Sequence, residues 1–103
     1  MNTSQNQNIN TNPSLCIPRV DLHFTKEKIY DIFQKLNFGK LDRVDVVHKK
    51  TLKREEYKCI FIHFKYWYNN ENSEKIKERM LLKNDIKIIY EFPWFWKIYI
   101  NKF

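Results

Sequence analysis

The sequence predicts a small α+β domain whose elements follow one another as strand, helix, strand, strand, helix, strand. Its 103 residues leave room for one compact domain. Apolar residues alternate with polar ones at three places along the chain, which is typical of strands: 41–48, 57–64 and 85–91. Over residues 29–36 they recur instead at the spacing of an amphipathic helix.

The chain is basic, with 19 Lys and Arg against 12 Asp and Glu and a formal net charge of +7. This balance indicates an anionic partner such as a nucleic acid, an acidic protein surface or a membrane. No apolar run approaches the roughly 18 residues that a membrane span needs. The first 14 residues lack the basic start and apolar stretch of a secretory signal. We therefore expect an intracellular protein that is not secreted and has no membrane partner.

Residues 1–14 carry no charge and few apolar side chains. They cannot bury enough surface to offset the entropy lost on ordering, so we predict a disordered Asn-rich tail. The pattern changes at Leu15, and residues 15–20 (Leu-Cys-Ile-Pro-Arg-Val) are predicted as the first strand. The predicted domain spans residues 15–91.

The first helix is predicted from Thr25, a plausible N-cap. Four residues at helical spacing form its apolar face: Ile29, Ile32, Phe33 and Leu36. Gly39 is the chain's one glycine. We predict that it ends the helix, because a helix C-terminus favours a residue that adopts the left-handed conformation.

Two strands and a basic loop follow. Over residues 41–48 the valines Val44 and Val46 share one side of the predicted strand. Residues 49–54 form a strongly basic loop. In the third strand, 57–64, one side is predicted to carry three residues: Cys59, Phe61 and His63.

The second helix is predicted over residues 73–83, capped by Ser73 and with Ile76 and Met80 as an apolar i, i+4 pair. The last predicted strand is 85–91. Residues 92–103 then form an aromatic C-terminal extension, Phe-Pro-Trp-Phe-Trp-Lys at its start, in which the proline interrupts strand pairing. We expect this extension to pack on the domain.

This element order is the ferredoxin-like βαββαβ arrangement, a four-stranded antiparallel sheet with both helices on one face. Residues 15–91 resemble the RNA recognition motif, whose two signatures lie on the central strands. Residues 15–20 fit the aliphatic positions of the first signature, with Cys16 at its aromatic position and Arg19 at its Asn position. Residues 57–64 keep the last four positions of the second signature, where Phe61 retains a base-stacking position. The resemblance implies RNA binding on the open face.

The sequence also resembles a group of small proteins without established activity that giant nucleocytoplasmic DNA viruses encode. The resemblance covers nearly the whole chain apart from the Asn-rich tail. Four segments carry it: 16–20, 61–64 with Trp67 shortly after, 85–90 and 93–97. The abundance of Lys, Asn and Ile agrees with an AT-rich genome. The resemblance implies a viral protein located in the host cytoplasm or a viral factory.

These observations lead to one function hypothesis, low-specificity binding of single-stranded nucleic acid, with RNA preferred over DNA. Three aromatic residues would stack bases: Phe61, Trp94 and Trp96. Six cationic residues would contact phosphates: Arg19, Lys49, Lys50, Lys53, Arg54 and Lys97. Each set also has an interpretation without a ligand. The rings could pack in the hydrophobic core, and the basic loop could simply be exposed to solvent.

The alternative is a protein-interaction module of the same fold, or a homodimer, that does not bind nucleic acid. Its anchors would be aromatic, because Trp and Tyr are enriched at interface hot spots. The candidates are Tyr66, Trp67, Tyr68, Trp94 and Trp96.

We predict no enzyme activity, because no nucleophile and base with a paired carboxylate are close in sequence and no Gly-rich phosphate loop is present. Cys16, Cys59 and His63 share one predicted face, but they lack the paired short spacing and the fourth ligand typical of structural zinc. We therefore predict no metal, cofactor or small-molecule substrate. Both cysteines are expected as free thiols.

Overall fold

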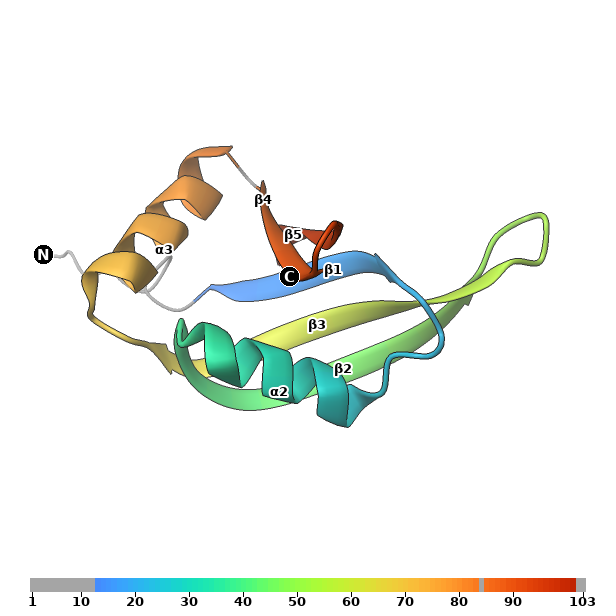
Figure 1. The fold of residues 1–103 in the computed structure, drawn as a ribbon, viewed down its shortest axis with the longest axis horizontal. Coiled ribbons are helices and arrows are strands. Elements are labelled where there is room, and N and C mark those ends of the chain that lie inside the picture. The colour runs from blue at the N-terminus through green and yellow to red at the C-terminus, as the bar shows by residue number, and fades with distance from the viewer. Residues whose placement is uncertain (1–12, 84, 102–103) are drawn as a thin grey trace, which may run out of the picture.

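The computed structural model describes residues 13–83 and 85–101 (Figure 1). In chain order the elements are β1 (Ser14–Val20), α2 (Lys26–Leu36), β2 (Gly39–Lys50), β3 (Glu56–Trp67), α3 (Glu71–Lys83), β4 (Asp85–Glu91) and β5 (Trp94–Asn101). All strands pair antiparallel in a single sheet. The predicted α+β class is confirmed. The predicted tail is outside the described residues at 1–12, whereas Ser14 already belongs to β1.

The sheet has five strands in the order β2-β3-β1-β5-β4, so the predicted number of four was wrong. The fifth strand comes from residues 94–101, which were expected as an extension. Pro93 lies in the turn between β4 and β5, where it has no ladder hydrogen bond to donate. The chain therefore reverses there, and β5 enters between β1 and β4. Residues 102 and 103 are outside the described part.

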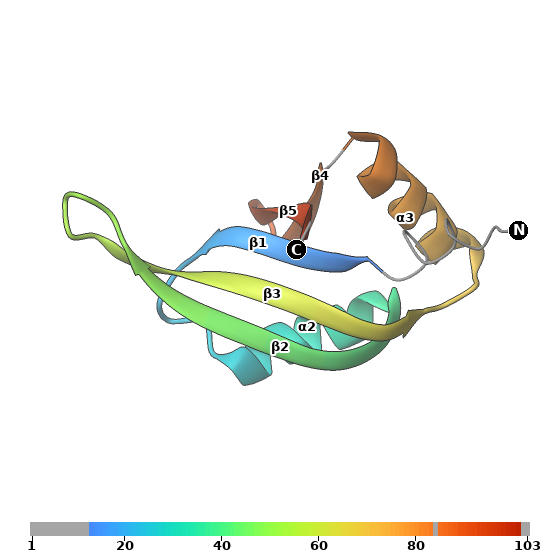
Figure 2. The ribbon, with the colours of Figure 1, turned by 180° about the vertical axis from the view of Figure 1, so that it is seen from behind.

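Alternate residues of each strand face the core. In β1 and β3 these are Leu15, Ile17, Ile60, Ile62 and Phe64, all buried. Ile29 and Phe33 of α2 and Met80 of α3 belong to the same core cluster. Both helices therefore cover one face of the sheet. Figure 2, seen from behind, shows β2, β3 and β1 in front of α2, with their other face uncovered by the described elements.

The first helix begins as predicted. The Thr25 hydroxyl accepts a hydrogen bond from the amide of Lys28 at 3.0 Å. The prediction for Gly39 was wrong, because the left-handed residue after α2 is Asn37, with φ 61°. Gly39 begins β2, where a Cβ atom would lie 2.4 Å from the carbonyl oxygen of Tyr66. The glycine therefore permits close approach of two backbones.

The second helix begins at Glu71, two residues before the predicted start. Asn70 caps it, since its side-chain oxygen accepts a hydrogen bond from the amide of Ser73 at 2.8 Å. Ser73 is fully buried inside the first turn, and its hydroxyl donates to the carbonyl of Asn37 at 3.2 Å. The helix is thereby fastened to the end of α2.

Candidate nucleic-acid interface

One row of residues crosses the open face of all five strands. From β2 to β4 its members are Asp45, Phe61, Cys16, Tyr99 and Asp85, each directly opposite the next. The rings of Phe61 and Tyr99 are half-buried and flank the small thiol of Cys16. Two strand spacings separate them, about 10 Å. We call these two rings and the Cys16 side chain the aromatic row.

A second aromatic position lies next to the aromatic row. Tyr57 of β3 is half-buried and follows the same alternation as Cys59 and Phe61. The guanidinium of Arg19 lies over the Tyr57 ring, 4.6 Å from its centroid. Lys49 of β2 is directly opposite Tyr57. An irregularity between Ile17 and Val20 interrupts the β1–β3 register next to Arg19.

The other end of the open face carries a hydrogen-bonded chain of polar side chains. The Ser14 Oγ lies 3.0 Å from Nδ1 of His63, and Nε2 of His63 lies 3.0 Å from an Asp45 carboxylate oxygen. Arg43 Nε donates to both oxygens of that carboxylate, at 3.1 and 3.2 Å. Burial raises the pKa of Asp45, but hydrogen bonds and charge from Arg43 and His63 lower it by more. The carboxylate is therefore held ionised.

Several cations on this face have acidic partners. Lys97 Nζ lies 3.6 Å from Asp85, and Arg19 lies 3.7 Å from Glu55. Lys87 of β4 is opposite Lys97 and lies over the Phe95 ring, 4.9 Å from its centroid. Both ion pairs are partly or largely solvent-exposed, so each stabilises the fold by at most about 1 kcal/mol.

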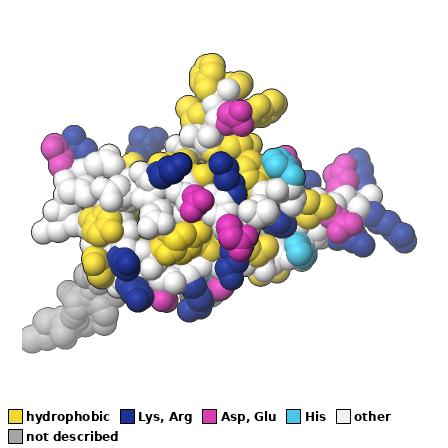
Figure 3. Space-filling view, turned by 60° about the horizontal axis from the view of Figure 1, so that its bottom comes forward, with side chains coloured by type: hydrophobic (Ala, Val, Ile, Leu, Met, Phe, Trp, Pro, Cys, Tyr) yellow, Lys and Arg dark blue, Asp and Glu magenta, His cyan; other side chains and the backbone are white. Residues whose placement is uncertain are grey.

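The predicted basic loop is the connection between β2 and β3. Lys49 and Lys50 are the last residues of β2, and Lys53 and Arg54 lie in the turn itself. Arg54 adopts a positive φ of 68°. Figure 1 shows the loop extending from the body of the molecule, and Figure 3 shows basic and acidic side chains intermixed at that end. The loop is therefore an arm of mixed charge beside the open face.

Trp94 and Trp96 are not on the open face, which corrects their expected place in the stacking platform. Trp96 points to the core and is 4% exposed, stacked on Tyr90 with centroids 4.4 Å apart. Trp94 lies at the β4–β5 turn and is 63% exposed. Because side chains alternate along β5, the open face receives Phe95, Lys97 and Tyr99.

The aromatic residues of the alternative protein-contact patch are also partly buried and partly exposed. Trp67 is 7% exposed, stacks on Phe38 and donates its indole N–H to the carbonyl of Pro13 at 2.9 Å. It anchors the end of β3 and is not available to a partner. Tyr66 is exposed and Tyr68 is half-buried, in edge contact with each other.

Tyr57 and Tyr99 are the site residues that the sequence reasoning missed. Tyr99 could have been found from the alternation Trp94, Trp96, Ile98 in residues 94–101, which puts the intervening residues on the other face. This strand was not predicted because Pro93 was taken to interrupt strand pairing. Tyr57 begins the predicted third strand, 57–64, but no functional role was predicted for it.

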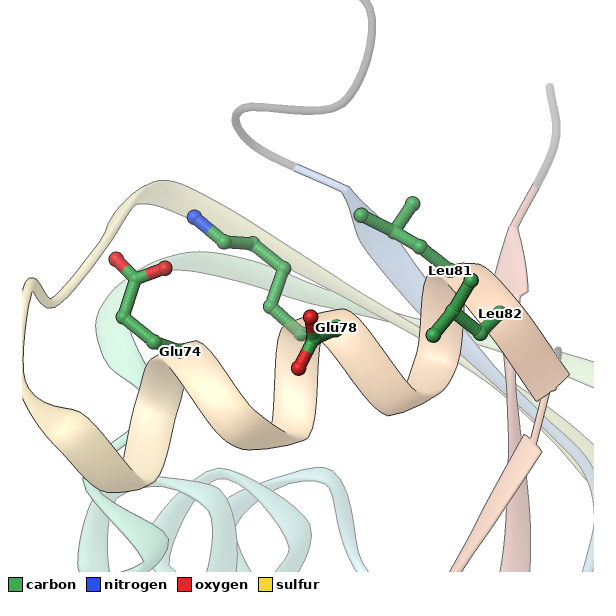
Figure 4. A pocket seen from close by; sticks show the side chains of 5 residues that line it. Glu74, Glu78, Leu81 and Leu82 are labelled. Carbon is green, nitrogen blue, oxygen red and sulfur yellow. The ribbon is translucent and has the colours of Figure 1, made fainter.

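A separate surface hollow lies along α3 (Figure 4). Its volume is about 240 Å³, and its lining includes Glu74, Glu78, Leu81 and Leu82. All lining residues come from one helix and point outward, so the hollow is a groove between successive turns. Over residues 13–83 and 85–101, no three His, Cys, Asp or Glu side chains are placed to hold a metal ion. Neither described helix is both long and apolar enough to cross a membrane.

Comparison with known proteins gives no matching family model, no similar curated protein and no similar solved structure.

Proposed function

We propose that the chain binds single-stranded nucleic acid, RNA in preference to DNA, on its open face. The observation that carries the proposal is the aromatic row, in which Phe61 and Tyr99 present half-exposed rings across the three central strands. Aromatic rings stack bases of any sequence and contribute about 1–3 kcal/mol per base. A strand lying across β3, β1 and β5 would meet both rings.

Charge supports the same face. Arg19, Lys49 and Lys97 lie beside the aromatic row on three strands, and the arm of mixed charge extends from one end of it. They would contact phosphates, with release of counterions on binding. Asp45 and Asp85 close the row at its two ends, so a polyanion would be held over β3, β1 and β5.

The proposed specificity is low. His63 and Asp45 are already bonded to each other and to Ser14 and Arg43, so these polar groups are not free to read base edges. Stacking without such readout tolerates every base. We also propose that the fold is a variant of the ferredoxin-like arrangement that the RNA recognition motif has. In this variant β5, and not β4, pairs with β1 and takes the place of the last strand.

The test is a fluorescence anisotropy titration with labelled single-stranded RNA and DNA of about 10–20 nucleotides, at low and moderate salt. Phe61→Leu and Tyr99→Leu keep apolar bulk but remove the ring. Each should weaken binding by about 1–3 kcal/mol. Tyr66→Leu is the matched control, an exposed ring of β3 outside the aromatic row, and should leave the affinity unchanged.

Two outcomes would contradict the proposal. Equal affinity of the parent chain and both leucine variants would remove the aromatic row from the site. Binding that disappears at moderate salt in all chains alike would reduce the net charge of +7 to nonspecific attraction. Circular dichroism of each variant establishes that the fold is kept.

A further inference from the structure

A hollow of about 280 Å³ opens on the helix side of the sheet, between the loop after β1 and the β4–β5 turn. Its lining combines aromatic rings and carboxylates: Asp21, His23, Phe24, Tyr90, Glu91 and Trp94. None of these residues belongs to the aromatic row. We refer to this hollow as the acidic hollow.

The aromatic walls of the acidic hollow are held in place by packing. Phe24 is buried and meets Tyr90 edge to face, with centroids 5.0 Å apart and ring planes at 87°. Trp96 stacks behind Tyr90 and also meets Phe24 edge to face, at 5.1 Å. Two perpendicular rings thus form a fixed corner. Trp94 lines the same hollow with a ring that is mostly exposed.

Backbone geometry brings the carboxylates to these rings. The amide of Phe24 donates to the carbonyl of Asp21 at 3.2 Å, which closes a tight turn and holds both residues at the hollow. Glu91 is directly opposite Trp94 where the hairpin turns. Burial raises the pKa of the Tyr90 hydroxyl, and the negative charges of Asp21 and Glu91 raise it further. The two carboxylates make the rim of the acidic hollow negative, while the Lys58 ammonium donates a hydrogen bond to the carbonyl of Phe24 beside one wall.

We propose that the acidic hollow binds an organic cation, a quaternary or methylated ammonium group. Such a group carries its charge on methyl carbons, is weakly hydrated, and is attracted to the faces of Trp, Tyr and Phe. Asp21 and Glu91 neutralise the charge from the rim. An inorganic divalent cation would need more oxygen ligands than two exposed carboxylates supply.

Two sources share this chemistry, the methylated lysine side chain of a protein and a choline-type head group. The inference is independent of nucleic-acid binding, because the site lies on the other face of the sheet and its charge repels phosphates. Two titrations, one with free trimethyl-lysine and one with choline, distinguish the sources.

The experiment follows the N-methyl proton resonances of each cation by NMR as the full chain is added. A methyl group over a ring face shifts upfield, so the signal reports contact with the aromatic walls. The neutral alcohol 3,3-dimethylbutan-1-ol, which has the shape of choline without its charge, is the ligand control. His23 Nδ1 lies 3.9 Å from Asp21, so both titrations are made at one fixed pH.

We expect at least one of the two cations to shift upfield and saturate, and the alcohol to bind more weakly. Trp94→Ala should weaken cation binding about 2- to 30-fold. Asp21→Asn and Glu91→Gln should weaken it as well. Phe92→Ala is the matched control, since Phe92 is an exposed ring of the same turn that does not line the hollow, and it should bind like the parent chain.

The inference is overturned by any of three results: no upfield shift with either cation, equal binding of choline and the alcohol, or equal losses in Trp94→Ala and Phe92→Ala. The first would exclude the site. The second would show a merely apolar hollow. The third would show that the turn acts through its structure and not through the Trp94 ring.

Discussion

The sulfur atoms of Cys16 and Cys59 lie 3.9 Å apart on the open face, and both thiols are free. Burial is the main reason why the pKa of Cys16 is raised to about 12, followed by the charge and hydrogen bond of Cys59. Lys49 opposes the shift without cancelling it. The neutral thiol is therefore the form present beside Phe61 and Tyr99.

Alkylation of Cys16 should be slow and should accelerate with pH well past the ordinary cysteine range, because only the thiolate reacts. Iodoacetamide labelling between pH 7 and 10.5, read by peptide mass spectrometry, measures this. In urea the Cys16 rate should be half-maximal near pH 9 and level off above it, whereas in the native chain it should still be rising at pH 10.5. A native rate that is half-maximal near pH 9 would contradict the assignment.

The same shift makes the fold alkali-sensitive. The folded pKa of Cys16 lies above the unfolded value, so its contribution to stability is complete below about pH 9 and is lost as pH rises toward 12. Cys16→Ser should lessen this loss, measured as the urea midpoint at pH 8 and pH 10.5.

Gly39→Ala should destabilise the domain by at least about 1–3 kcal/mol, because the new Cβ meets the Tyr66 carbonyl at 2.4 Å and the Trp67 Cα at 2.8 Å. Asn37→Gly serves as the control, since glycine accepts the left-handed conformation found there, and it should stay within about 1 kcal/mol. Urea denaturation measures both. If Gly39→Ala left the free energy of unfolding unchanged, β2 and β3 would be able to move apart at this point without loss of stability.

Trp67→Phe should cost about 1–3 kcal/mol, because it keeps a ring against Phe38 but leaves the carbonyl of Pro13 without its donor. Tyr66→Phe removes a hydroxyl from an exposed neighbour and should change the free energy of unfolding by less than about 0.5 kcal/mol. Equal midpoints for the two variants would show that the indole hydrogen bond contributes nothing.

Asp45→Asn should destabilise the domain more at pH 7 than at pH 3. The folded pKa of Asp45 is depressed, so its contribution is present above the unfolded value of about 3.9 and is lost as pH falls through the folded value. The difference between the parent and variant urea midpoints should therefore shrink on acidification. A constant difference would mean that the Arg43 and His63 contacts do not depend on the charge of Asp45.

Periodicity was sufficient to predict α2 and the two faces of β2 and β3. Thr25 caps its helix, and Cys59, Phe61 and His63 share a face, because these features depend on spacing within one element. The α+β class, and the pairing of β1 with β3 at the centre of the sheet, followed from the order of the predicted strands and helices.

The remaining features depend on tertiary contacts that spacing does not encode. Gly39 was assigned to a helix end because glycine favours left-handed backbone, but the requirement comes from β3 passing close by. The function hypothesis placed Trp96 among the base-stacking rings, with a place in the core as the alternative, and its burial depends on β5 joining the sheet. Pro93 was interpreted as an interruption of strand pairing, but it lies in the turn where the chain reverses from β4 into β5.

The place of β5 in the sheet also has a consequence for biosynthesis. Leu15 pairs with Ile100 on one side and with Ile62 on the other. During translation β1 can join β3 early, but its second edge stays open until β5 has left the ribosome. An unpaired edge is a template for association with other chains, so the nascent protein exposes this edge of β1 to aggregation until β5 has paired with it.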